Sequence, residues 1–147
     1  MAGNSILAAV DLQHEESDAH VAAEALSLAR THGADLHLIY VVPDQQISYV
    51  QNYVPKDMKA QVDADANEHL QSFLALLDTG DVSVDLHVQR GIVYEEIINV
   101  SNQISADFVV VGSNKPKLTD FFMGPNAARV ARHAECSVMI VRPSRSD

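Results

Sequence analysis

The residues best suited to chemistry lie between positions 112 and 127, which read Gly-Ser-Asn-Lys-Pro-Lys-Leu-Thr-Asp-Phe-Phe-Met-Gly-Pro-Asn-Ala. Gly112 closes an apolar run, and Gly124 precedes a short amphipathic stretch. Glycine lets the backbone come close to a ligand, and the start of a helix offers free N–H groups and partial positive charge to an anion. Lys115 and Lys117 lie between the two glycines and could screen phosphate charge. The segment therefore predicts an anion site between a strand and a helix.

A second candidate is Asp11, which follows the apolar run 6–10. Its carboxylate could accept a hydrogen bond from a ribose hydroxyl or an adenine edge, while Val41, near the end of the next apolar run, could form an apolar wall for a base. In open parallel sheets, ligands bind beyond the carboxyl ends of the strands, where the strand order reverses. If the first and fourth strands are neighbours, Asp11 and Gly112 face each other across that crevice. Taken alone, Asp11 could equally start a turn.

The elements that would position these residues alternate along the chain. Short apolar runs predict strands at 6–10, 36–42, 82–88, 108–111 and 138–141. Amphipathic stretches predict helices from a cap at Ser17 to a stop at Gly33, and over 56–77, 93–104 and 125–134. This alternation indicates an α/β fold: a doubly wound, Rossmann-like sheet of five parallel strands in the order 3-2-1-4-5, with helices on both faces. With 147 residues, we expect a single domain over 1–147.

Two of the predicted strands have the character of sheet edges. In the third strand, apolar and polar residues alternate strictly from Val82 to Val88, as expected of a half-exposed strand. The last strand, Val138 to Val141, is wholly apolar, although the final strand of such a sheet commonly lies at an edge. An exposed apolar edge favours pairing with a second chain, so we predict a homodimer through this strand. The alternative is that the C-terminal tail or a helix covers it.

Charge separates the chain into two parts. The formal charge is -10, but residues 1–114 hold four basic against 17 acidic side chains, whereas residues 115–147 hold six basic against three acidic ones. The acidic body argues against nucleic acid as a partner. No apolar run approaches the roughly 18 to 20 residues of a membrane-spanning helix, and the single cysteine, Cys136, fits a reducing, cytoplasmic setting.

No catalytic or metal-binding constellation is evident. The seven histidines are scattered, and no pair has the spacing of a zinc helix motif, so we interpret them as solvated or packing residues. Cys136 precedes an apolar strand without an obvious activating base. We expect no metal ligand from the protein, although Mg²⁺ could arrive with nucleotide phosphates.

These pieces together resemble the universal stress protein family over nearly the whole chain. The resemblance rests on the first strand ending Ala-Val-Asp11, the second ending Ile-Tyr-Val41-Val, Gly91 before the third helix, the run Ala-Asp-Phe-Val-Val-Val-Gly-Ser, and the closing stretch Gly124 to Arg142. The closing stretch is especially similar to that of the small bacterial members that bind ATP. Their signature is Gly, two residues, Gly, nine residues, then Gly followed by Ser or Thr.

The resemblance implies a site for ATP, or for ADP or AMP. It assigns Asp11 to the ribose and adenine region, Val41 to adenine, residues 112–115 to ribose and phosphates, and residues 124–127 to the phosphates. The full implied set is Ala9, Val10, Asp11, Val41, Val111, Gly112, Ser113, Asn114, Lys115, Met123, Gly124, Pro125, Asn126 and Ala127.

The chain departs from this signature at three points. Lys115 replaces the second glycine, the loop to Gly124 is one residue shorter, and Pro125 replaces the Ser or Thr. Proline suits the first turn of a helix, but it removes a hydroxyl and an N–H donor.

The family resemblance implies a cytoplasmic, dimeric regulator that binds an adenine nucleotide and supports survival under stress. One alternative is a dimeric interaction module that has lost its nucleotide, marked by Lys115 and Pro125. The other is a slow ATPase or autokinase, for which Ser113, Thr119 and Asp120 are candidates.

Overall fold

A computed structural model describes residues 4–43, 56–113 and 124–142. Strands and helices alternate along it: β1 (Ser5–Ala9), α1 (Glu15–His32), β2 (Asp35–Pro43), α2 (Lys56–Ala75), β3 (Val84–Gly91), α3 (Val93–Gln103), β4 (Phe108–Gly112), α4 (Gly124–His133) and β5 (Ser137–Val141). All four strand pairings are parallel, and the strands lie in the order β3-β2-β1-β4-β5. The predicted fold class and strand order are therefore confirmed.

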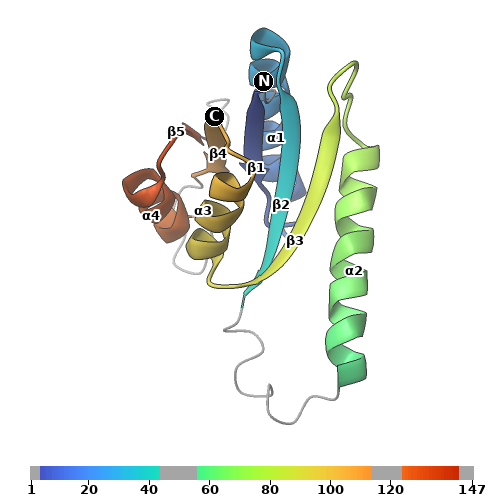
Figure 1. Ribbon diagram of the computed structural model, residues 1–147. Helices are drawn as coiled ribbons and strands as arrows, with labels where there is room; N and C mark the ends of the chain where they lie inside the picture. The colour runs from blue at the N-terminus through green and yellow to red at the C-terminus, as the bar shows by residue number, and fades with distance from the viewer. Residues whose placement is uncertain (1–3, 44–55, 114–123, 143–147) are drawn as a thin grey trace.

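Alternate residues of each central strand face opposite sides of the sheet. Ile6 and Ala8 of β1 pack in a core with α1 and the second half of α2, whereas Leu7 and Ala9 pack in a second core with α3 and α4. All four of these β1 side chains are buried. Strand β1 is apolar from Ile6 to Ala9 because helices cover both faces of the sheet (Figure 1).

Helix α1 begins two residues earlier than the predicted cap at Ser17. Its N-cap is His14, which makes no capping hydrogen bond through its side chain, so Ser17 lies inside the helix. The carboxylate of Asp11 accepts the N–H groups of Gln13 and His14, and this turn starts the helix in place of a serine cap. The predicted stop is confirmed: Gly33 adopts a left-handed conformation, with φ 60°, and donates its N–H to Ala29 and Arg30 carbonyls.

Strands β3 and β5 form the two edges of the sheet, as predicted. Strand β3 begins two residues later than expected, at Val84, and most of its side chains are half-buried. On β5, Ile140 keeps 38% of its surface exposed. The described residues of this chain therefore leave apolar surface uncovered at the β5 edge.

Candidate functional site

The carboxyl ends of β1 and β4 lie side by side at the centre of the sheet. The two strands pair in register, with Ile6 opposite Phe108 and Ala8 opposite Val110. Two residues further along, this register sets Val10 level with Gly112. Strand β1 pairs with β2 on its other side, so the strand order reverses here, which is where open α/β sheets bind ligands.

Asp11 is buried at this point, with 1% of its surface exposed. Its Oδ1 accepts the N–H groups of Gln13 at 2.9 Å and His14 at 3.1 Å, and its Oδ2 lies 3.0 Å from His14 Nδ1. The Asp18 carboxyl lies next to that of Asp11 as well. Asp11 thus fixes the turn that follows β1, at the edge of the sheet where the strand order reverses.

Asp18, which the sequence analysis did not single out, contacts the main chain of the same turn. Its Oδ1 accepts the N–H of Asp11 at 3.0 Å, and its Oδ2 accepts the N–H of Leu12 at 2.8 Å. Burial, followed by the negative charge of Asp11, raises the pKa of Asp18 to about 7. Burial and the charge of Asp11 also raise the pKa of Tyr40 on β2. An acid placed seven residues after Asp11 was the only available sequence signal.

The apolar residues assigned to the site fall into two groups. Side chains of Ala9, Val41, Val111 and Ala127 are all buried in the core that β1, β2 and β4 form with α3 and α4. Val10 instead packs in the core on the α1 side of the sheet. The structure therefore places four of these five residues on one face, the face on which α4 begins.

The glycine after β4 has a packing role. A Cβ atom at Gly112 would lie 3.0 Å from Cγ2 of Val21 on α1, which is closer than ordinary contact. The next residue, Ser113, donates its N–H to the carbonyl of Val141 at 2.9 Å. Since that amide is already bonded, only the side chain and carbonyl of Ser113 are left to meet a ligand.

The phosphate end of the predicted site is partly described. Helix α4 begins at Gly124, as the two-glycine pattern predicted, and the right-handed return from β4 to β5 places its amino end at the carboxyl edge of the sheet. Asn126 is half-buried near that end, and Pro125 occupies the first turn. Asn114, Lys115 and Met123, together with Lys117, Thr119 and Asp120, lie outside the described residues.

The cationic side chain closest to this end within the described part of α4 is turned elsewhere. The guanidinium of Arg129 lies 5.3 Å from the centre of the Tyr94 ring on α3. Tyr94 also lies beside His133, with ring centres 6.1 Å apart. Of the basic residues of the C-terminal segment, Arg129 is thus engaged between α3 and α4, and Arg132 and Arg142 are exposed. Lys115, Lys117 and Arg145 lie outside the described residues.

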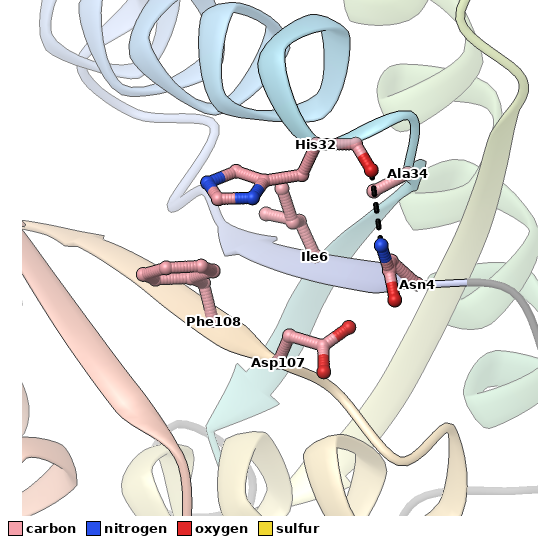
Figure 2. Close-up of a pocket in the computed structure, with 6 residues that line it drawn as sticks. All are labelled: Asn4, Ile6, His32, Ala34, Asp107 and Phe108. Carbon is pink, nitrogen blue, oxygen red and sulfur yellow. Dashed lines mark hydrogen bonds between the residues drawn. The ribbon is translucent and has the colours of Figure 1, made fainter.

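The opposite end of β1 and β4 carries a shallow pocket of about 220 Å³. Figure 2 shows its lining, in which the rings of His32 and Phe108 lie on one side and the polar groups of Asn4 and Asp107 on the other. No residue of the predicted nucleotide site lines it. The chemistry predicted at the carboxyl ends of the strands is therefore separate from this pocket.

The described residues contain neither a cluster of metal ligands nor a reactive thiol. In the described part of the chain, no three His, Cys, Asp or Glu side chains converge as metal ligands. Burial raises the pKa of the Cys136 thiol, which keeps it protonated and poorly reactive.

Among the helices of the described ranges, none combines the length and apolar character that crossing a bilayer requires.

Comparison with known proteins gives one consistent result. The model of the universal stress protein family matches residues 4–142. Universal stress protein G of Shigella flexneri is 27% identical over 140 residues, covering 94% of this chain and 98% of that protein. The universal stress protein of Archaeoglobus fulgidus in complex with dAMP superposes with a TM-score of 0.69 at 17% identity, covering 96% of this chain and 99% of that one. A universal stress protein in complex with cAMP gives a TM-score of 0.60 at 19% identity, with 98% and 100% covered.

Proposed function

Because the chain belongs to the universal stress protein family, we propose that it binds an adenine nucleotide, ATP or its products ADP and AMP, in the crevice at the carboxyl ends of β1 and β4. In this role it acts as a cytoplasmic, homodimeric regulator of the response to stress. The observation that carries the proposal is the place of Asp11: a buried acceptor, held in a fixed turn, where the strand order reverses.

The surroundings of Asp11 support a base and a ribose at this edge. The core around Val41 and Val111 ends at this edge. An adenine packed against it would bury apolar surface, which stabilises the complex by about 25 cal/mol per Å² of apolar area buried. A ribose hydroxyl would donate to a carboxylate oxygen of Asp11. Two proteins of the same fold were solved with adenine nucleotides, dAMP and cAMP.

The amino end of α4 would hold the phosphates, because the first N–H groups of an α-helix have no partner within the helix and point towards an anion. Pro125 contributes no N–H to this end, and the amide of Ser113 is bonded to Val141. With two donors absent, Lys115 and the helix dipole would provide much of the attraction, and Mg²⁺ would join through the phosphates. We therefore expect a modest preference among ATP, ADP and AMP.

The absence of these two N–H donors favours one alternative function, a dimeric interaction module that binds no nucleotide. In that case the lack of a side chain at Gly112 makes room for Val21, and the Asp11 carboxylate only fixes its own turn. The chain would then keep the family fold and its β5 edge while the crevice stays filled by its own side chains.

Isothermal titration separates the two functions. Protein stripped of ligand by denaturation and refolding is titrated with ATP, ADP and AMP, each to millimolar concentration. Binding heat that saturates supports the nucleotide site, and absence of heat with all three contradicts it. In parallel, mass analysis of the small molecules released when freshly purified protein is denatured identifies any nucleotide it carried.

A further inference from the structure

The turn between β1 and α1 is held by a residue outside it. Asp18 lies in the first turns of α1, and its carboxylate reaches back to accept the main-chain N–H groups of Asp11 and Leu12. Leu12 has φ 61°, a left-handed conformation that residues other than glycine seldom adopt. A conformation of this kind persists only where the surroundings fix it. The Leu12 side chain is buried in the core, and the two hydrogen bonds that Asp18 accepts fix the main chain at Leu12 and at Asp11 before it.

Asp11 is consequently fixed at both its main chain and its side chain. Asp18 holds the backbone N–H, and the Asp11 carboxylate holds the amides of Gln13 and His14. Because the main chain sets the position of Cβ, any shift of the turn would move the carboxylate away from the crevice. The orientation of Asp11 therefore depends on Asp18.

Keeping Asp18 at this place is unfavourable for the folded protein. It is 4% exposed and sits beside a second buried carboxylate, and both burial and the charge of Asp11 favour its protonated form. An apolar helix residue would avoid this cost on the face that packs on the sheet. Groups whose pKa is strongly shifted by burial and by a neighbouring charge cluster at functional sites.

We propose that Asp18 is a positioning residue of the nucleotide site: its ionised carboxylate holds the main chain of Asp11 and Leu12 and so presents Asp11 to the nucleotide. This inference rests on the proposed function, because it assumes that Asp11 meets the nucleotide. Asp18 itself touches no ligand in this assignment.

A dependence of affinity on pH follows. Ionised Asp18 accepts two N–H groups, whereas protonated Asp18 carries a donor on one of the two oxygens, so protonation loosens the turn. Its pKa of about 7 places this change between pH 8 and pH 6, with the weaker binding at the acidic end. The titratable groups that share this environment are Asp11 and His14 in the turn and Tyr40 on β2. Strands β4 and β5, which also pack against α1, bring Gly112 and Val141 to this edge, neither of which titrates.

The test compares nucleotide affinity in four proteins by titration calorimetry with ATP. Asp18→Asn keeps the size of the side chain but sets an NH₂ group against a main-chain N–H, and we expect affinity at pH 8 to fall about tenfold or more, which is about 1.4 kcal/mol. Asp107→Asn is the matched control, because Asp107 likewise accepts a main-chain N–H, that of Ser5, at the other end of β1. Its affinity should equal that of the wild type.

The pH profile distinguishes positioning from general stability. The terminal phosphate of ATP titrates in the same pH range in every experiment, so the test is the difference between variants. Wild type should lose more affinity for ATP between pH 8 and pH 6 than Asp18→Asn does, and His14→Gln should lose as much as wild type. Equal affinity for ATP, and an equal change of affinity with pH, in wild type and Asp18→Asn would overturn the inference. An affinity that does not change with pH in either wild type or His14→Gln would also overturn it. The second comparison can be made even if Asp18→Asn fails to fold. If wild type binds no ATP at any pH, it is the proposed function that fails.

Discussion

The Nδ1 atom of His37 on β2 lies 2.8 Å from the Nε2 atom of His87 on β3, a hydrogen bond between two imidazoles across parallel strands. The residues are diagonal in the register, in which His37 pairs with Asp85 and Ile39 with His87. Their rings are 5.1 Å apart and tilted by 31°. For one ring to donate and the other to accept, at least one of the two must be neutral.

This pair predicts a loss of stability in mild acid. Burial, and then the nearby His37, lowers the pKa of His87 below 6.5, so the unfolded chain binds the proton more readily than the folded one. The contribution of His87 to the free energy of unfolding is therefore full above pH 6.5 and falls as the pH drops below it. Urea unfolding at pH 7.5 and pH 5.5 should show a smaller acid loss in His87→Gln than in wild type.

Asp18 acts on stability with the opposite sign, so the comparison must be made between variants. Its pKa is raised in the folded state, so its contribution favours folding at low pH and weakens as the pH rises towards about 7. Because wild type and His87→Gln both contain Asp18, its contribution to the change in unfolding free energy with pH is the same in both and cancels in their difference. An acid loss as large in His87→Gln as in wild type would contradict the assignment to His87.

Packing around Gly112 gives a prediction about the core. Gly112→Ala would place a Cβ atom 3.0 Å from Val21 Cγ2, and we expect a loss of about 1 kcal/mol in unfolding free energy from overpacking. In a Val21→Ala background, the added methyl group fills vacated space, so the same change should cost nothing or stabilise. Urea unfolding of the two single variants and the double variant measures this coupling. If the loss of unfolding free energy in the double variant equals the sum of the two single losses, the contact between residues 112 and 21 does not restrict the side chain at position 112.

The fold could be predicted from the sequence because its signals are local. Apolar runs such as 6–10 and 108–111 show strands covered on both faces, and the alternation before Gly91 shows an edge, so the strand order was predicted correctly. The start of α1 was placed too late because a serine near a helix start is a common cap, whereas the cap position here is His14, in the turn that Asp11 holds. Local patterns carry no information on which side chain reaches back into a turn.

Details of the site depend on contacts between distant segments. The bond from Ser113 to Val141 follows from the pairing of β4 with β5, and the His37–His87 pair follows from the β2–β3 register across 50 residues of sequence. Val10 and Ala9 are adjacent in the chain, yet their side chains face opposite cores. These relationships appear only when the strands are set in register. The sequence could therefore predict the place of the candidate site in the fold, but not the contacts between its residues.

The predicted homodimer is tested at the β5 edge. Ile140, which is 38% exposed on that strand, would be buried between two copies, so Ile140→Glu should introduce charge into the interface and yield monomers. Leu76→Glu is the control, because Leu76 is 77% exposed just after α2 and away from this edge. Sedimentation at micromolar concentration should give dimers for wild type and Leu76→Glu. A wild-type monomer, or an Ile140→Glu dimer, would contradict pairing through β5.

A bulky residue at Gly124 tests the phosphate end independently of Asp11. Gly124 is the first residue of α4, where the proposed site would bring a phosphate close to the main chain, and a branched side chain would keep that phosphate away. Gly124→Val should therefore abolish measurable ATP binding in calorimetry while adenosine, which has no phosphate, binds as it does to wild type. The β5 edge lies at a different part of the sheet, so sedimentation should show an unchanged oligomeric state. Ala75→Val also adds a branched side chain, but at an exposed position at the end of α2, away from the crevice, and should leave ATP affinity intact. ATP binding by Gly124→Val at wild-type affinity would place the phosphates away from the start of α4.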